Sequence, residues 1–544
     1  MVSFEKIVKV CFSVFIVLSF VSCSGDKKTD VTDEDNTNSN DADQTIVPDE
    51  TADEAVDESV DKDLSDEVLT ESETVDETAD ETIIDEEIDE EADEDTFVPY
   101  DPRVAPALCG INEYTWLKQE DLQMGTGLGF VLESKELLTD LEGIAARKKT
   151  ALITLMETND EVKSRNIVRR PKHDVRIFKI RYQTQDKGKL VDATGIVAFP
   201  DLKDNTETFP VVSILHGTAP GFADACAPST DETAEGEATG TGVLLASFGY
   251  IIIAPDYIGL KSMGEASTEI HPYLIAEPTA ISVLDMMRAA RNLLSLINAK
   301  AIPGDNAIIG GSQGGHAAAF TTRYQPYYAP ELVIKGASWG IPPTDLGTHA
   351  QQALQNFVKA SGNTALFLLT SNSWYTGDHT NLSEVFVSPF DVDFPVAAID
   401  PGCDMGDSVD GMDSLDDLYS TEILAEAAVE PFLVNMPPWD CFVEVNTLPT
   451  SPLPRIDDIP ALMVLGELDD LVDPGIETAS FQKLCEQGYQ INYKMCQGAG
   501  HVDGWAWSLE EQFDWVDARI ANVPMTDYCT VKEPIRCANT PDGE

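Results

Sequence analysis

A short apolar run, a glycine-rich turn and a helix-like segment follow one another at residues 307–320, and they constrain the fold more than any other feature. This stretch reads AIIGGSQGGHAAAF and sets Ser312 between glycines. A serine on an open loop needs no such neighbours, whereas a serine on a turn too tight for side chains does. The G-x-S-x-G pattern from Gly310 to Gly314 therefore predicts a strand, a strained turn carrying Ser312, and a helix that starts near Gly315 and His316.

Strand-like and helix-like segments alternate beyond Tyr100. The segments VRIFKIRYQTQ and KLVDATGIVAFP, joined by Asp186-Lys187-Gly188, predict an antiparallel hairpin. FPVVSILHG and GYIIIAPD are continuously apolar, as in strands covered on both faces, and residues 279–298 have helical spacing. NAIIGG, ELVIKGASWG, ALMVLGE and INYKMCQ supply further strands. We therefore expect an α/β fold, a mostly parallel sheet with helices on both faces.

A long stretch between Trp339 and Pro460 breaks this alternation, because a simple crossover needs far fewer residues. It contains the helix-like segments HAQQALQNFVKA and LYSTEILAEAAVEPFLV and the acidic run DMGDSVDGMDSLDDLY. We interpret residues 346–457 as a cap inserted into a core formed by residues 99–345 and 458–544. The acidic run lacks the spacing of an EF-hand, so we expect a solvated loop rather than a metal site.

The N-terminus has the features of a targeting segment. Lys6 and Lys9 precede an apolar run at residues 10–21, which is too short to span a bilayer and predicts a signal peptide over residues 1–22. The run ends in FVSC, which resembles the lipobox of bacterial lipoproteins and predicts lipidation of Cys23. Simple secretion with cleavage nearby is the alternative.

The next segment, residues 23–98, is strongly acidic. From residue 26 to residue 98 it has 32 aspartates and glutamates, 3 lysines and a single aromatic residue, Phe97. Such a composition cannot bury enough apolar surface to offset the entropy of ordering, so we expect a disordered leader. We accordingly expect an exported lipoprotein, anchored to a membrane at the cell envelope or cell surface. The net charge of -61 argues against nucleic-acid binding.

Eight of the ten cysteines remain once Cys11 leaves with the signal peptide and Cys23 is lipidated. An even count in an exported chain favours disulfides, but spacing does not rank the 105 possible pairings. No CxxC pair is present, so the sequence predicts no structural zinc site.

Ser312 requires a base, because a serine hydroxyl is a poor nucleophile until its proton is removed. In chains with this turn the order is serine, acid, histidine. Only His501, in GAGHVDGW after the last predicted strand, follows every plausible acid. His316 lies one helical turn from Ser312, and we expect it to be structural.

The acid should follow the preceding strand, where ALMVLGELDDLVDP offers Asp469, Asp470 and Asp473. The spacing G-x-x-D-x-x-V selects Asp469, with Asp470 as the alternative. The developing oxyanion needs preorganised donors. We expect one from the backbone N–H of Gln313 and one from that of Thr218, although a histidine-glycine pair also ends strands for steric reasons alone.

Several of these segments together resemble one family. GGSQGGHAA, APDYIGL, HPYL and DACAPS, with residues 466–472 and 498–501, are similar to the secretory lipase family of α/β-hydrolases over residues 109–523. The resemblance implies an α/β-hydrolase fold with a cap. It also implies a lipase or carboxylesterase that cleaves acyl esters through an acyl-enzyme intermediate without a cofactor.

Two other functions stay open at the level of the sequence. A serine aminopeptidase would use the same three residues, with carboxylates of the cap holding the substrate amine. A surface-displayed binding protein would keep the hydrolase fold without activity, although the presence of Ser312, Asp469 and His501 counts against it.

Overall fold

The computed structural model describes residues 104–105, 109, 114–119, 122, 127–268, 270–376, 382–405, 413–456 and 458–541, which belong to one compact unit. The expected signal peptide, Cys23 and the acidic leader lie outside the described residues, as do His379 and residues 406–412 of the acidic run. Among the described helices, none has both the length and the apolar character needed to cross a membrane.

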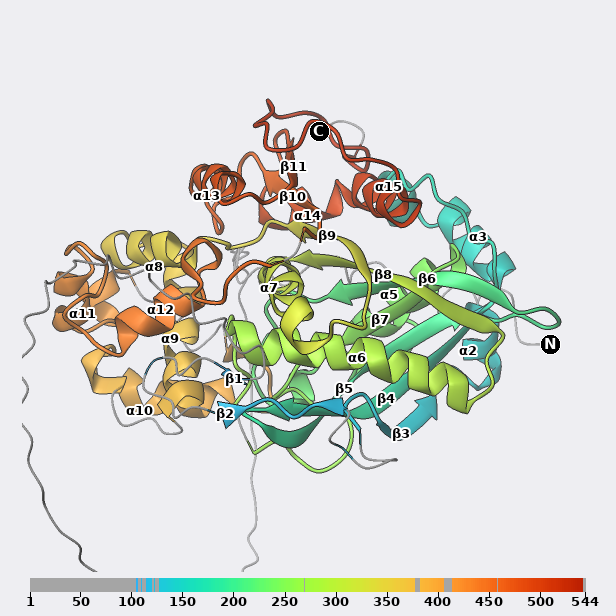
Figure 1. Ribbon diagram of the computed structural model, residues 1–544, viewed down its shortest axis with the longest axis horizontal. Helices are drawn as coiled ribbons and strands as arrows, with labels where there is room; N and C mark the ends of the chain where they lie inside the picture. The colour runs from blue at the N-terminus through green and yellow to red at the C-terminus, as the bar shows by residue number, and fades with distance from the viewer. Residues whose placement is uncertain are drawn as a thin grey trace, which may run out of the picture. The chain divides into compact units, whose positions relative to one another are not determined.

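A nine-stranded mixed sheet forms the centre of the molecule (Figure 1). Its order is β11-β10-β9-β8-β6-β7-β5-β4-β3. The strands β6 to β11 run parallel to one another, and β5, β4 and β3 follow β7 as antiparallel neighbours. The strands are β3 (Val131–Glu136), β4 (Val175–Asp186), β5 (Lys189–Pro200), β6 (Glu207–Leu215), β7 (Ile251–Pro255), β8 (Ala301–Gly311), β9 (Ile334–Gly340), β10 (Ala461–Gly466) and β11 (Ile491–Cys496). A separate pair joins β1 (Val104–Ala105) to β2 (Tyr114–Thr115).

The predicted hairpin and central strands are confirmed. β4 and β5 pair from Val175↔Pro200 to Asp186↔Lys189, so the turn falls at Lys187 and Gly188. The middle of the sheet is buried on both sides, which is why its strands read as continuous apolar runs. Because the parallel strands point the same way, their carboxyl ends meet along one edge, where ligands bind in folds of this kind.

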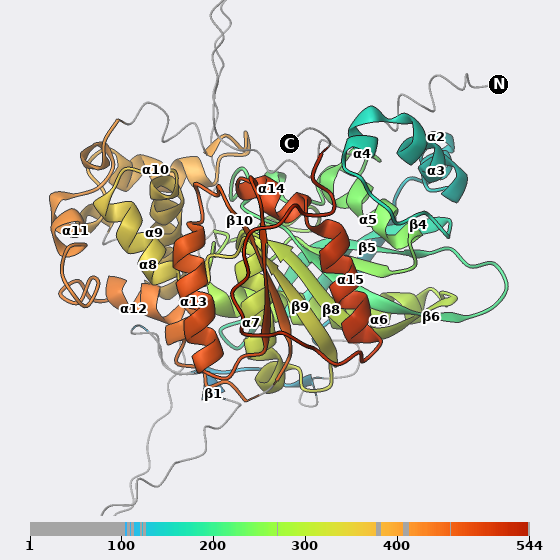
Figure 2. The same ribbon diagram turned by 90° about the horizontal axis from the view of Figure 1, so that it is seen from above.

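Helices cover both faces of the sheet (Figures 1 and 2). The helices α5 and α15 share an apolar cluster with Val212, Ile252 and Ile309, while α6 packs against α7 and β4. The helices of the core are α2 (Leu141–Ala146), α3 (Lys149–Thr158), α4 (Asp160–Ser164), α5 (Glu237–Ser247), α6 (Ala276–Leu296), α7 (Gln313–Tyr328), α13 (Pro474–Glu486), α14 (His501–Ala506) and α15 (Leu509–Ile520). The expected α/β architecture is confirmed; one detail is wrong, because α7 begins at Gln313, directly after the serine.

The chain between β9 and β10 forms a group of helices beside the sheet, at the left of Figures 1 and 2. They are α8 (Leu346–Gln355), α9 (Ala360–Thr376), α10 (Phe390–Ala398), α11 (Thr421–Glu426) and α12 (Trp439–Val445). Their buried faces share an apolar cluster that includes Phe367, Trp439 and Phe442. The two helices expected here are shorter than predicted. α11 stops at Glu426, and the backbone turns over the residues that follow. We call residues 346–457 the cap.

All eight expected cysteines form disulfides, which are typical of exported proteins. The pairs are Cys109–Cys441, Cys226–Cys403, Cys485–Cys529 and Cys496–Cys537. The first two join the cap to segments that precede it in the chain, and the last two brace the C-terminal tail. Spacing could not rank these pairings, because every pair joins segments that are at least 41 residues apart and meet only in the tertiary fold.

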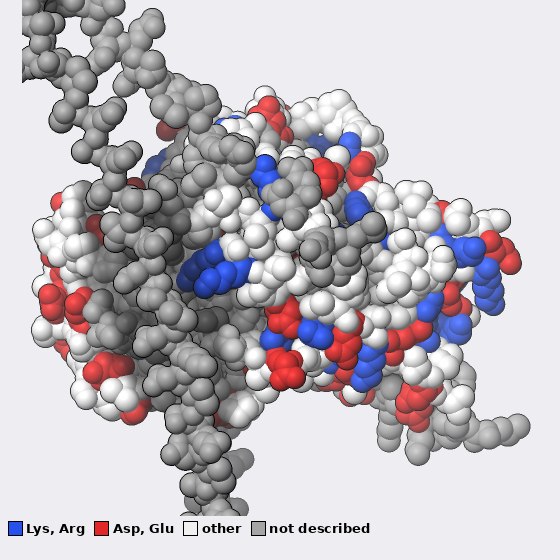
Figure 3. Space-filling view, turned by 60° about the horizontal axis from the view of Figure 1, so that its bottom comes forward, with Lys and Arg blue, Asp and Glu red and all other residues white. Residues whose placement is uncertain are grey.

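Acidic and basic side chains are interspersed on the face shown in Figure 3. Paired charges in the described core include Arg181–Asp192, Lys261–Asp192 and Arg147–Glu136.

Candidate active site

Ser312 lies at the junction of β8 and α7, with φ 57 and ψ -119, a conformation that non-glycine residues rarely adopt. Its backbone N–H donates to Gly340 O at 2.9 Å, which ties the turn to the end of β9. A Cβ on Gly310 would lie 2.0 Å from Gly314 O, and one on Gly314 would lie 2.0 Å from Leu215 O. Two glycines of the motif are therefore required by close backbone approach.

Ser312, His501 and Asp469 are brought together in one hydrogen-bonded series. His501 Nε2 lies 2.9 Å from Ser312 Oγ, and His501 Nδ1 lies 2.8 Å from Asp469 Oδ2. The Asp469 side chain is 2% exposed. In this arrangement the carboxylate fixes Nδ1 as the protonated nitrogen, which leaves Nε2 free to accept the serine proton.

The two neighbouring aspartates of the acid loop point in different directions. Asp469 Oδ1 accepts from the backbone N–H groups of Leu471 and Val472, at 3.0 and 2.9 Å, and these bonds hold its carboxylate toward His501. Asp470 is exposed and pairs instead with Lys359 Nζ of the cap at 2.7 Å. Of the two residues that the sequence left open, only Asp469 contacts the histidine.

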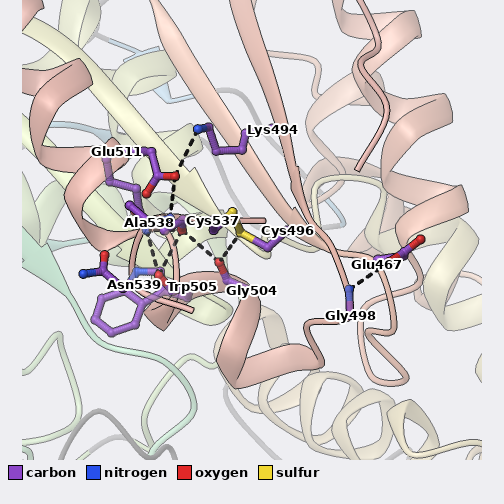
Figure 4. The surroundings of a disulfide bond; sticks show 12 residues. Glu467, Lys494, Cys496, Gly498, Gly504, Trp505, Glu511, Cys537, Ala538 and Asn539 are labelled. Atoms are coloured by element: carbon purple, nitrogen blue, oxygen red, sulfur yellow. Dashed lines mark hydrogen bonds and ion pairs between the residues drawn. A yellow bond between two sulfur atoms is a disulfide. The ribbon is translucent and has the colours of Figure 1, made fainter. Parts of the chain in front are cut away.

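The segment that leads from β11 to His501 is held by a disulfide and by a backbone hydrogen bond (Figure 4). The disulfide Cys496–Cys537 joins the end of β11 to the C-terminal tail, and Glu511 holds that tail by accepting from the backbone N–H of Ala538 at 2.8 Å. The backbone N–H of Gly498 donates to Glu467 Oε2 at 2.8 Å, so the histidine loop is also bonded to the acid loop.

The expected oxyanion donors lie on two converging segments. Gln313 is the first residue of α7, where a backbone N–H has no partner within its own helix and lies at the positive end of the helix dipole. Thr218 follows β6, and its Oγ1 lies 2.9 Å from the hydroxyl of Tyr273. Tyr257 OH donates to the carbonyl of His216 at 3.1 Å and stacks on that ring, which holds the turn before Thr218.

The other described histidines near the site, His216, His271 and His316, have neutral rings. Burial lowers the pKa of His216 and of His316 to about 4, and that of His271 to about 3, so all three rings stay neutral. His316 bonds to Asn446 O at 2.9 Å, as expected for a structural residue on its own helix. Within the described part of the chain, no group of histidine, cysteine, aspartate and glutamate side chains is arranged to hold a metal ion.

Three of the motifs that carry the family resemblance make contacts that the sequence did not predict. Ser229 of DACAPS bonds to the buried carboxylate of Asp256 in APDYIGL through both its backbone N–H and its hydroxyl. His271 and Tyr273 of HPYL contact Gln313 and Thr218. The motifs were visible as strings of residues, but only the fold brings them against the site.

Comparison with known proteins supports the same family. The family model described as secretory lipase matches residues 236–375. A protein named probable inactive lipase MT1628, from Mycobacterium tuberculosis, is 28% identical over 291 residues. That match spans 52% of this chain and 57% of the relative, so the chain covers little more than half of the relative's length.

Solved structures share the fold at low sequence identity. The rice cell wall degrading esterase LipA from Xanthomonas oryzae is 18% identical, with a TM-score of 0.55 over 72% of this chain and 97% of that one. Candida antarctica lipase A in its closed state is 17% identical, with a TM-score of 0.57 over 76% and 87%. These matches agree with the resemblance read from the motifs: residues 236–375 match the secretory lipase family model, and the chain has an α/β-hydrolase fold.

Proposed function

We propose that the protein is an exported serine ester hydrolase in which Ser312 is the nucleophile, His501 the general base and acid, and Asp469 the residue that orients the histidine. The observation that carries this proposal is the hydrogen-bonded series Ser312–His501–Asp469 on a strained turn at the carboxyl edge of the sheet. The substrate class, acyl esters, follows from the similarity to lipases and esterases.

The proposed reaction starts from the hydrogen bond between His501 Nε2 and Ser312 Oγ. His501 Nε2 takes the proton of Ser312 Oγ as that oxygen attacks the acyl carbonyl carbon. The carbonyl oxygen becomes an oxyanion that the N–H groups of Gln313 and Thr218 stabilise. His501 then gives the proton to the leaving alcohol, which leaves an acyl ester on Ser312. Water, deprotonated by His501, hydrolyses this ester and restores the serine.

Labelling with a fluorophosphonate tests the nucleophile directly, because the probe reacts with serines activated by a neighbouring base. Intact mass should show one adduct on the wild type and none on Ser312→Ala. A matched control is Ser338→Ala, which removes the buried hydroxyl of a serine on β9 that bonds to Gln512 of α15. Equal labelling of wild type and Ser312→Ala would contradict the assignment.

An inactive fold is the competing proposal, favoured by the name of the Mycobacterium relative. A protein of that kind would bind a ligand without turning it over. The two proposals separate in one assay series, with p-nitrophenyl esters of rising acyl length beside aminoacyl-nitroanilides. We expect ester cleavage that Ser312→Ala abolishes. No labelling and no turnover would favour the inactive protein, and faster cleavage of a nitroanilide than of any ester would favour an aminopeptidase.

We also propose that Cys23 carries a lipid anchor and that the acidic leader is a spacer. A flexible chain of about 75 residues has a root-mean-square reach of roughly 50 Å, and repulsion among its carboxylates extends it. Detergent-phase partitioning should be lost in Cys23→Ser. Unchanged partitioning of that variant would contradict the anchor.

A further inference from the structure

The segment His271-Pro272-Tyr273 lies buried beside the proposed oxyanion donors. His271 is fully buried and Tyr273 nearly so. Gly259 allows this segment to come close, because a Cβ there would lie 2.5 Å from the Cα of His271, and its φ is +84. The segment is therefore built tightly against the loop that follows β7.

The side chain of His271 bonds to Gln313, the residue after the nucleophile. His271 Nδ1 lies 2.9 Å from Ile258 O, and His271 Nε2 lies 2.8 Å from Gln313 Nε2. A carbonyl oxygen only accepts, so Nδ1 carries the proton and Nε2 accepts from the Gln313 amide. Among the described residues, this is the one hydrogen bond of the Gln313 side chain, and its Oε1 has no partner.

The side chain of Tyr273 bonds to the residue expected to supply the second oxyanion donor, Thr218, and to the cap. Its hydroxyl oxygen accepts from Asn363 Nδ2 at 3.0 Å and lies 2.9 Å from Thr218 Oγ1. Asn363 belongs to α9 of the cap. Tyr273 therefore connects the turn that carries Thr218 to a helix of the cap.

We propose that His271 and Tyr273 are positioning residues for the oxyanion site: His271 holds Gln313 through its side chain, and Tyr273 holds Thr218. The proposal rests on the proposed function, since it concerns the same reaction. The two side chains come from one segment, so one rigid piece of backbone sets the spacing between the two donors. Neither side chain touches the Ser312–His501–Asp469 series in any described hydrogen bond, so both act on the transition state only through the donors.

The test compares variants that remove these bonds with variants that keep them. His271→Leu and Tyr273→Phe remove the bonds, and His271→Gln keeps a neutral hydrogen-bonding group near the position of Nε2. Tyr182→Phe is the matched control, because it removes a buried hydroxyl that bonds to Ser282 O between β4 and α6. The readouts are kcat and KM for a p-nitrophenyl ester and the inhibition constant of an aryl trifluoromethyl ketone, which forms an oxyanion on the serine.

We expect His271→Leu and Tyr273→Phe each to lower kcat about 10-fold with KM little changed, since loss of a whole donor costs about 10²–10³. Binding of the ketone should weaken by a similar factor, and His271→Gln should recover part of the loss. Gln313→Leu should reproduce the defect of His271→Leu, and the double variant should be no worse than either single one.

The proposal is overturned if both variants keep kcat and ketone binding at the level of Tyr182→Phe, or if KM rises while kcat is unchanged. It is also overturned if the defects of His271→Leu and Gln313→Leu multiply, because the two side chains would then act independently. Failure of the proposed function looks different: the wild type itself would be neither labelled by fluorophosphonate nor inhibited by the ketone.

Discussion

The core and the cap contribute to the site in different ways. All three residues of the Ser312–His501–Asp469 series follow strands of the core sheet: Ser312 and Asp469 come after β8 and β10, and His501 begins α14 after β11. The cap supplies none of them, yet it bonds beside the site at two places: Lys359 pairs with Asp470 next to the acid, and Asn363 bonds to Tyr273 next to Thr218.

The two regions are also held by different forces. Backbone hydrogen bonds along parallel strands fix the core, and the turn at Ser312 is itself bonded to β9. The cap is joined to earlier segments by two disulfides, and to α13, which follows it, by side-chain pairs such as His349 with the buried Glu477. Changes in the core should therefore affect chemistry and folding together, whereas changes at the cap boundary should affect stability first.

The largest effect should come from the two adjacent aspartates, of which one faces the core site and the other faces the cap. We expect Asp469→Asn to lower kcat about 10⁴-fold, because the amide favours the wrong tautomer of His501. Asp470→Asn should leave kcat near that of the wild type and cost less than about 1 kcal/mol of stability, since its pair with Lys359 is exposed. Steady-state kinetics of the two variants make the comparison. If Asp470→Asn lost activity and Asp469→Asn kept it, the assignment of Asp469 as the acid would be wrong.

A pair of glycine substitutions comes next. A Cβ on Gly314, in the core turn, would meet backbone oxygens at 2.0 and 2.8 Å, whereas one on Gly347, in α8 of the cap, would meet side-chain atoms at 3.4 Å. We expect Gly314→Ala to cost at least about 3 kcal/mol or to give no folded protein, because a backbone cannot move aside cheaply. Gly347→Ala should be neutral or stabilising, because alanine favours helix. Melting temperatures, with soluble yield, decide this, and equal losses would contradict the contrast.

The difference between core and cap also determines how much of the structure the sequence could predict. The strands around Ser312 were predictable because burial on both faces leaves continuous apolar runs, and the turn was predictable because close backbone approach requires Gly310 and Gly314. Asp469 was preferred by spacing alone, and its geometry agrees. The helix start at Gln313 was missed by two residues because Gly314 and Gly315 read as turn residues although they lie inside α7.

The cap was less predictable because its structure depends on contacts between distant segments. The helix expected within residues 418–434 ends at Glu426, because hydrophobic spacing alone does not indicate where the backbone turns. The bond from Asn363 to Tyr273 joins residues 90 positions apart, and no periodicity indicates it. The roles of His271 and Tyr273 were hidden for the same reason.

A third prediction concerns the disulfide between the cap and the core. Cys226–Cys403 closes 177 residues of chain, and Cys485–Cys529 closes 44. Replacing both cysteines of the first pair with serine should lower stability by about 2–4 kcal/mol, roughly 1 kcal/mol more than the same change in the second, because the longer loop gains more entropy on unfolding. The kcat for a short-chain ester should survive the first change, since the reacting groups lie in the core. Loss of kcat at full folding would show that the cap helps to order them.

The smallest effect should be a change in the pH dependence of stability at the boundary with the cap. Glu277 is buried where α6 meets the cap; it accepts from Trp116 Nε1 at 3.1 Å and from Tyr114, and its neighbour Ala276 donates to Asn446 of the cap. Burial raises the pKa of Glu277 to about 7 from its ordinary value of 4.5. The folded state then holds a proton that the unfolded state releases, so stability is full below about pH 4.5 and falls as the pH rises to about 7.

Glu277→Gln keeps a carbonyl oxygen for the two donors and removes the titration. We expect it to raise the unfolding free energy by about 1–2 kcal/mol at pH 8 and to change it little at pH 4.5, measured by urea unfolding with the disulfides intact. Glu237→Gln is the matched variant in the core, because burial also raises the pKa of Glu237 to about 7 at the start of α5, away from the cap. Equal gains from both variants would mean that desolvation alone sets the pH dependence. A loss at pH 8 from Glu277→Gln would instead mean that its carboxylate is charged in the folded protein and helps to hold the cap boundary together.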